Sequence, residues 1–479
     1  MPRDVKIPQV DPEDKVLSEL VDAIRSEVAR RHGAELTFEE RRDAAAKVMR
    51  EVLWLDEDRD LRGLVSRSEE VEVDGKRYKR LEQPSSAIYY GRWGAHSVPE
   101  PLYRQVGVRN GPTIKPLELK VGMISRHMTP DLARIVGELG ALGSSREVKR
   151  WLVAVGLVPP GRAFLEKRMQ ELAQEISGQI DALEEAARAI TPVPAEVGSL
   201  SCGMDRMAVR MAEPADPETA APPRRTTPYQ RTPPPPKEHR YRMSWSGSTT
   251  IYDREGEPLQ TWRYAAEAAE DPDALARRIA ADARWIALHH PGIPIHCIQD
   301  AASELKALPK ALLASLPANT NAREFVDFQH LMGYLEAVVN ACEPAGDPSN
   351  MKEWYRWQLL CDDTAIDRIY RKLRRIYRAL PVLETAKRDA LYDAISYIRT
   401  RKDKMRYASA RAQRLPIGSG ATEGTCGLMQ QRVKRRGQSW GPPGLKGVLA
   451  IRGLALSDRW HAAWQAYAAS HRFEVRGAA

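Results

Sequence analysis

The stretch VGSLSCGMDRMAVRM, Val197–Met211, sets the fold class that the sequence predicts. It is rich in glycine, cysteine, methionine and valine, which is typical of a buried strand, and Asp205 is its only carboxylate. Later segments complete the pattern: strand-like residues 240–252 and 258–264, a helix that opens at Asp271, and an apolar strand at 293–298 that runs into Asp300. The order strand, strand, strand, helix, strand predicts a mixed sheet covered by helices.

Composition restricts the class of protein further. The chain has 479 residues, and its 73 basic and 64 acidic side chains give a formal net charge of +9, which favours a polyanionic partner without identifying one. No apolar run approaches the ~20 residues of a membrane span. The first residues, Met1–Asp4, lack the apolar segment of a secretion signal, so we expect a cytoplasmic protein. None of the five cysteines precedes Cys202 and none forms a Cys-x-x-Cys pair, which excludes a zinc ribbon in the N-terminal half.

Six regions are expected, which makes this a multidomain α/β protein. Asp74-Gly75 between alternating residues indicates a β-hairpin in the second region. Three helices with a tight second turn in the third region indicate a helix-turn-helix, although a plain helical bundle explains them equally well; the third helix is expected to run unbroken over 165–187. The regions are an N-terminal helical region at 1–65, a small β-rich module without zinc at 66–112, a helix-turn-helix-like domain at 113–192, a first part of the sheet core at 193–342 with a proline-rich loop at 212–238, a helical insertion at 343–411, and a core completion at 412–479.

Three carboxylates occupy positions that suit catalysis. Asp205 lies within a buried type of strand, where an uncompensated charge is costly. Asp300 ends a second strand, and strand ends are where α/β folds place chemistry. Glu423 lies in the first turn of a helix that the stretch GSGATEG, Gly418–Gly424, opens. Side chains of this kind repel one another when they are brought together, and divalent cations with oxygen ligands, such as Mg²⁺, remove that penalty.

The third acid has competitors. Asp362, Asp363 and Asp367 lie within the expected insertion, but they fall within helical periodicity, whereas Glu423 has the glycine-rich approach. Spacing by itself is weak support for any such set, because 64 acidic residues offer many triples.

Two basic segments are candidates for DNA contact. The first follows the helix of Glu423, where lysines and arginines are interleaved with tryptophans, a pattern that suits phosphate neutralisation and base stacking. The second is the outer face of an amphipathic helix in the insertion. Solvated charge beside structural tryptophans is the alternative for both. The proposed DNA-binding residues are Arg432, Lys434, Arg435, Arg436 and Trp440 in the first segment and Arg371, Arg374 and Arg375 in the second.

These C-terminal motifs resemble a known signature. The stretches are LPIGSGATEG at Leu415–Gly424, QRVKRRG at Gln431–Gly437, Trp440, IRGL at Ile451–Leu454, and Arg459 to Trp464. Together they are similar to the C-terminal signature of bacterial insertion-sequence transposases of the DDE class, in the branch allied to Mutator-like elements. The resemblance covers about 197–464, with a weaker echo over 116–172.

The resemblance implies a ribonuclease H-like core interrupted by a helical insertion. It makes Asp205, Asp300 and Glu423 the catalytic and metal-ligating acids, holding two Mg²⁺ ions for which Mn²⁺ could substitute. It also makes His330, in the Asp-x-x-His motif that begins at Asp327, a supporting residue. Relatives often carry glycine after the first aspartate, where this chain has Arg206.

The implied activity is binding of an element's terminal repeats, followed by strand cleavage and strand transfer. The implied partner is double-stranded DNA, both element ends and target, bound by a homodimer or higher oligomer associated with the nucleoid; neither a membrane nor an RNA partner is indicated. Two alternatives remain: a transposase-derived DNA-binding protein without catalysis, and a metal-dependent structure-selective nuclease of the same fold.

Overall fold

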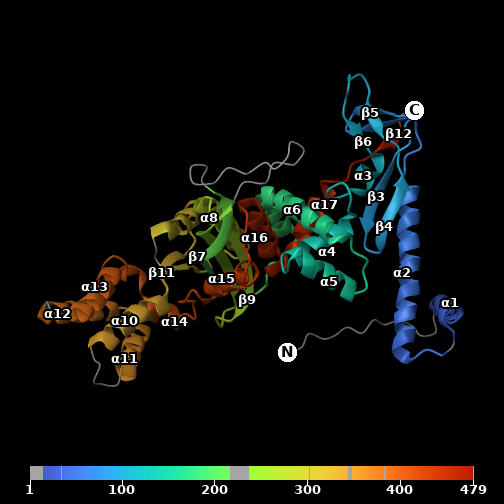
Figure 1. Cartoon of the computed structure of the whole chain (residues 1–479). Coiled ribbons are helices and arrows are strands. Elements are labelled where there is room, and N and C mark those ends of the chain that lie inside the picture. The colour runs from blue at the N-terminus through green and yellow to red at the C-terminus, as the bar shows by residue number, and fades with distance from the viewer. Residues whose placement is uncertain are drawn as a thin grey trace. The chain divides into compact units, whose positions relative to one another are not determined.

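The computed structural model describes residues 15–33, 35–215, 237–300, 303–342, 348–381 and 384–477 (Figure 1). The chain divides into two compact units. One comprises Met1–Glu171 with Tyr467–Ala479, and the other comprises Leu172–Ala466. In the described ranges, no helix combines the length and the apolar character needed to cross a membrane.

The first unit opens with two helices, in the region that the sequence predicts to be helical. α1 spans Lys15–His32 and α2 spans Phe38–Gly63. Thr37 caps α2: its side chain accepts from the Glu40 amide, and the Glu40 carboxylate accepts from the Thr37 amide. The shorter helices of this unit are α3 (Pro116–Val121), α4 (Pro130–Gly140) and α5 (Ser145–Ala154).

The β-rich module contains a five-stranded sheet and a separate hairpin. The hairpin that the sequence predicts at Asp74-Gly75 is present, and both residues take the positive φ that its tight turn requires (49° and 71°). The sheet order is β12-β1-β2-β5-β6 and the hairpin is β3-β4. The strands are β1 (Glu70–Val73), β2 (Lys76–Arg80), β3 (Ser86–Gly91), β4 (Gly94–Pro99), β5 (Tyr103–Gln105), β6 (Thr113–Ile114) and β12 (Arg476–Gly477).

Strand β12 pairs with β1 through Val71 and Gly477, so the end of the chain belongs to the first unit. This differs from the sequence-based expectation, in which residues 412–479 complete the core.

The expected single helix over 165–187 is wrong, because the structure has two helices there. α6 spans Arg162–Gly178 and α7 spans Ile180–Ile190. Gln179 between them leaves the helical region (φ −119°, ψ 14°). The apolar seam continues through the break, which is why its periodicity did not reveal the interruption.

The second unit is built on the mixed sheet that the sequence predicts. Its order is β11-β10-β7-β8-β9. Strands β7, β10 and β11 are parallel, and β8 is antiparallel to both β7 and β9. The strands are β7 (Ser199–Pro214), β8 (Lys237–Tyr252), β9 (Pro258–Ala266), β10 (Ile295–Gln299) and β11 (Ala322–Val326).

The proline-rich loop predicted over 212–238 is shorter than expected. β7 extends to Pro214 and β8 begins at Lys237, so both ends of that range are strand. Residues 216–236 lie outside the described residues.

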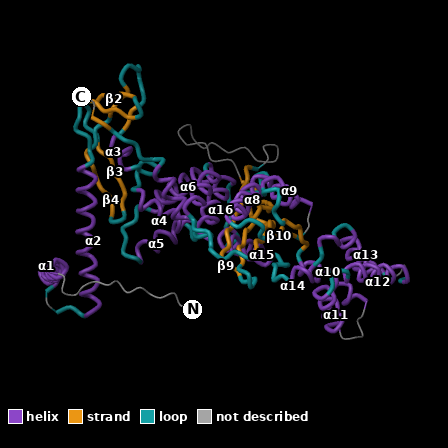
Figure 2. The backbone as a smooth tube through the Cα atoms, turned by 180° about the vertical axis from the view of Figure 1, so that it is seen from behind, coloured by secondary structure: helices purple, strands orange, loops and turns teal. Residues whose placement is uncertain are grey.

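Helices cover both faces of this sheet, as Figure 2 shows. Successive strand residues point to opposite faces. On β7, Leu200, Cys202 and Met204 pack in the cluster that contains helix α8 (Pro272–His289). Met207, Val209 and Met211 pack in the cluster formed by α15 (Gly420–Val433) and α16 (Pro442–Leu456).

A helical bundle adjoins β10 and β11 and shares one apolar cluster with them. It begins with α10, which starts at Phe328, ahead of the boundary expected at residue 343. Its helices are α10 (Phe328–Cys342), α11 (Pro348–Cys361), α12 (Ala365–Ala379), α13 (Thr385–Arg399) and α14 (Tyr407–Ala412). The remaining helices of this unit are α9 (Ala307–Ser315), which adjoins α8, and α17 (Trp460–Ala469), which extends into the first unit.

Candidate functional site

Asp205 and Asp300 lie at the same level of the parallel sheet. The register of β7 and β10 pairs Cys202 with Cys297, and each aspartate follows its cysteine by three residues. Since neighbouring strands are ~4.8 Å apart, residues at one level lie close together. Asp205 has the same parity on β7 as Met207, so it faces the side of the sheet that α15 covers.

Asp327 continues this row of acids and fixes two backbone segments. The register of β10 and β11 pairs Gln299 with Val326, so Asp327 follows β11 where Asp300 follows β10. Its buried carboxylate accepts from the His330 amide (2.6 Å) and from the Ser419 amide. Asp327 therefore joins the start of α10 to the loop that precedes Glu423.

Helix α15 holds Glu423 in its first turn, as the sequence predicts. The Ser419 hydroxyl donates to Glu423 Oε1 (3.0 Å). The adjacent Thr422 is buried, and its hydroxyl lies 2.8 Å from that of Ser248 on β8. Gly203 makes this approach possible, because a Cβ there would overlap the Thr422 hydroxyl and lie 2.9 Å from the Ile298 carbonyl oxygen.

The three acids of the sequence analysis line one cavity of about 200 Å³. Asp205 comes from β7, Asp300 follows β10, and Glu423 comes from α15. Burial raises the pKa of Asp205, the bond from the Arg206 amide opposes this, and the charges of Asp300 and Glu423 raise it further. The lining residues are Met204, Asp205, Gln299, Asp300, His330, Ser419, Thr422 and Glu423.

The residue types in this cavity suit hard divalent cations, because carboxylate oxygens are their preferred ligands. The side chains surround a shared space without converging on one point: across the described part of the chain, no group of three or more His, Cys, Asp or Glu side chains has the arrangement of a metal site. Holding a cation there requires these carboxylates to rotate inward. Glu423 is exposed, which leaves it room to do so.

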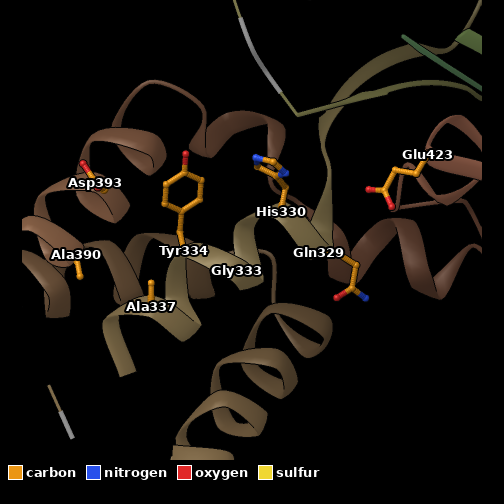
Figure 3. Close-up of a pocket in the computed structure, with 8 residues that line it drawn as sticks. All are labelled: Gln329, His330, Gly333, Tyr334, Ala337, Ala390, Asp393 and Glu423. Atoms are coloured by element: carbon orange, nitrogen blue, oxygen red, sulfur yellow. The ribbon is translucent and has the colours of Figure 1, made fainter. Parts of the chain in front are cut away.

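His330 links the acid cavity to a second one. It is exposed at the start of α10 and lines both cavities, as does Glu423. The second cavity, of about 480 Å³, runs between α10 and α13. Figure 3 shows Tyr334 between Asp393 and His330, with Glu423 on the far side of His330.

The competing third acids lie away from the acid cavity. Asp362 pairs with Arg368 (2.5 Å), Asp367 pairs with Lys402 (2.7 Å), and Asp363 accepts from the Ser409 amide (3.2 Å). None of the three lines the acid cavity.

The arginines proposed on the insertion helix are exposed together on α12. Arg371, Arg374 and Arg375 line a surface cavity of about 250 Å³ together with Arg378. Within the described ranges none of the four pairs with a carboxylate. Arg368, one turn earlier, does pair with Asp362.

The C-terminal basic segment is only partly exposed, which corrects the DNA-binding assignment of Arg432. Arg432 is buried, and its guanidinium lies 4.8 Å from the centre of the Trp440 ring. Trp440 is half-buried and donates its indole N–H to the Val433 carbonyl (3.0 Å), so this pair packs the end of α15. Lys434, Arg435 and Arg436 are exposed.

Two further arginines of this segment are structural. Arg452 is buried and donates to the Leu428 carbonyl. Arg459 is buried and donates to both carboxylate oxygens of Asp282 (2.7 and 3.0 Å). Sequence reasoning could not separate these from exposed arginines, because helical periodicity does not show which charge has a buried partner.

The fold and site define an α/β protein with three acidic side chains around one cavity. Asp205 lies within β7, Asp300 directly follows the parallel strand β10, and Glu423 lies in the first turn of α15. Comparisons with protein-family models, with curated proteins and with solved structures find no match to this chain.

Proposed function

We propose that this protein is a DDE-type transposase that cleaves the ends of its own mobile element and transfers them to target DNA. The observation that carries the proposal is the meeting of Asp205, Asp300 and Glu423 around one cavity, although they are far apart in the sequence. The order of strands in the sheet and the helical bundle that precedes Glu423 support a ribonuclease H-like core with an all-helical insertion.

The electrostatics of the cavity fit divalent cations. Two Mg²⁺ ions held by Asp205, Asp300 and Glu423, with Mn²⁺ as a substitute, would activate the attacking oxygen and stabilise the leaving oxygen in phosphodiester cleavage. Burial, and then the charges of Asp300 and Glu423, raise the pKa of Asp205, so its ionised form is disfavoured there, and bound cations would offset that cost.

The chain's own residues orient the reaction. Asp327 holds the loop before α15, and the Ser419 hydroxyl orients Glu423. His330, exposed beside the acid cavity, would contact the phosphate that is cleaved. Water attacks phosphorus at the element end and releases a 3′-hydroxyl. That hydroxyl then attacks a target phosphodiester, forming the new link and releasing a 3′-hydroxyl of the target.

Exposed cations provide the surface for double-stranded DNA. The arginines of α12 and the segment Lys434–Arg436 would neutralise backbone phosphates. Joining two element ends calls for a dimer or larger assembly on the DNA, because one cavity acts on one strand at a time.

The test uses purified protein, Mg²⁺, duplexes cloned from the DNA that flanks its own gene, and a supercoiled plasmid. Asp300→Asn and Glu423→Gln should abolish cleavage and retain duplex binding. Asp367→Asn is the matched control, because Asp367 pairs with Lys402 on the bundle, and it should cleave normally.

The outcomes separate the alternatives. Oligonucleotide joined to plasmid supports the transposase, whereas hydrolysis without joining would replace it with a structure-selective nuclease. Binding without any divalent-dependent cleavage would leave a non-catalytic DNA-binding protein.

A further inference from the structure

We propose that the cavity between α10 and α13 binds one unpaired nucleobase of the strand whose phosphate lies at the acid cavity, with the base stacked on Tyr334. This inference rests on the proposed function. The cavity of about 480 Å³ adjoins the acids through His330 and Glu423 (Figure 3). Its size falls within the ~300–1,000 Å³ of small-ligand pockets.

The chemistry of the walls excludes phosphate as the occupant. Neither lysine nor arginine lines this cavity, and the carboxylates of Asp393 and Glu423 would repel an anion. Gly333, Ala337 and Ala390 form a small, apolar wall that a flat group can approach closely. A nucleobase is planar, uncharged and partly apolar, so it fits where its own backbone does not.

Tyr334 is held as a stacking platform. Its ring stacks on that of Tyr397, with centroids 4.3 Å apart and an interplanar angle of 23°. Tyr397 is buried and donates its hydroxyl to the Asp300 carbonyl oxygen (3.0 Å), which ties the platform to the acid cavity. One face of Tyr334 is therefore occupied, and the ring is fixed before a base arrives.

Asp393 would determine which nucleobases the cavity prefers, at the end of the cavity away from the acids. It is exposed on α13, and its ionised carboxylate can only accept hydrogen bonds. A base with an exocyclic amine, which is adenine, cytosine or guanine, supplies a donor, whereas thymine presents only its ring N–H. The pocket should therefore favour amine-bearing bases over thymine.

Fluorescence anisotropy of the full-length protein with short labelled single strands tests the inference, in Ca²⁺ and with cleavage checked to be absent. One strand has a mixed sequence, a second is abasic at its central positions, and a third carries thymine there. Stacking contributes about 1–3 kcal/mol per base, so Tyr334→Ala should weaken binding of the mixed strand about 5- to 150-fold and leave the abasic strand unchanged. Tyr334→Phe should retain binding.

Two more variants guard against misfolding as the explanation. Gly333 lines the cavity, a Cβ there meets nothing within 4 Å, and leucine is a better helix former than glycine, so Gly333→Leu should narrow the cavity and remove the preference for bases. Tyr392→Ala changes an exposed tyrosine on α13 that does not line the cavity, and it should bind as the natural protein does. Asp393→Asn should reduce the preference for amine-bearing bases over thymine.

Equal losses on the mixed and abasic strands, or no loss in Tyr334→Ala and Gly333→Leu, would overturn the inference. The proposed function fails on a different result, which is cleavage retained in Asp300→Asn and Glu423→Gln. The two failures are therefore distinguishable.

Discussion

Replacing Gly203 with alanine tests the packing that positions Glu423. The added Cβ would overlap the Thr422 hydroxyl and approach the Ile298 carbonyl oxygen to 2.9 Å. Thr422 is 4% exposed, and its hydroxyl bonds that of Ser248 (2.8 Å), so it cannot turn away without breaking a buried hydrogen bond. Either the start of α15 moves or this bond is lost.

The size of the effect follows from these two costs. Overpacking of a filled core costs about 1–3 kcal/mol, and an unsatisfied buried hydroxyl costs about 1–3 kcal/mol. We expect Gly203→Ala to lower the free energy of unfolding, in urea titrations, by about 1–3 kcal/mol when one of these costs applies and by up to about 6 kcal/mol when both do. Cleavage by the folded fraction should fall about 100-fold, because Glu423 follows Thr422 directly and a ~1 Å misplacement has that effect.

A double-mutant cycle identifies the cause. Thr422→Ala removes the hydroxyl that the new Cβ meets, so Gly203→Ala combined with Thr422→Ala should be more stable than the sum of the single effects predicts, by about 1 kcal/mol or more. Gly427→Ala is the matched control on α15: its Cβ meets nothing within 4 Å, and it should gain up to about 1 kcal/mol. An unchanged stability in Gly203→Ala, or strict additivity with Thr422→Ala, would refute the reasoning.

Three further predictions follow from the charges. Burial and the acids at Asp300 and Glu423 raise the pKa of Asp205, so its ionisation weakens the folded state as pH rises above ~3.9, the value of an unperturbed aspartate. Urea titrations should therefore show Asp205→Asn to be more stable than the natural protein at pH 7, with the difference vanishing near pH 4; a pH-independent difference contradicts this. Replacing Arg371, Arg374 and Arg375 together by alanine should reduce, by about 3, the slope of the logarithm of the duplex-binding constant against the logarithm of the salt concentration. Arg368 is already paired with Asp362, so Arg368→Ala should change this slope by less than one. Arg459→Ala should cost about 3–5 kcal/mol of unfolding free energy by leaving Asp282 buried without this partner, while the folded fraction binds duplex DNA unchanged. A weaker salt dependence of duplex binding in this variant would contradict a purely structural role for Arg459.

The sequence predicted best where local chemistry determines the outcome. The glycine-serine approach marked the helix that carries Glu423, and Asp271-Pro272 marked the start of α8. The hairpin at Asp74-Gly75 follows from the positive φ that those residues tolerate. Each of these depends on a few neighbouring residues.

Predictions failed where a distant partner decides. Arg432 looks like a DNA-binding residue in the sequence, but it is buried and packs against the Trp440 ring at the end of α15. The helical bundle was expected to begin at residue 343, but it begins at Phe328. Helix α10 belongs to the bundle because it shares an apolar cluster with α13, and no local sequence pattern reveals that pairing. The helix expected over 165–187 breaks at Gln179, where the backbone leaves helical geometry although the apolar seam persists.

The acid cavity could be predicted from the sequence only in part. Strand parity alone places Asp205 on the face shared with Met207, and the sequence contains that information. What it lacks is the register of β10 against β7, because a shift by one residue would turn Asp300 to the opposite face. The close contact of Gly203 with Thr422 depends on that same sheet surface, since it brings α15 against β7 next to Asp205. Register and close packing therefore act as one constraint: a chain that keeps the acids but loses Gly203 should keep the sheet and lose the cavity.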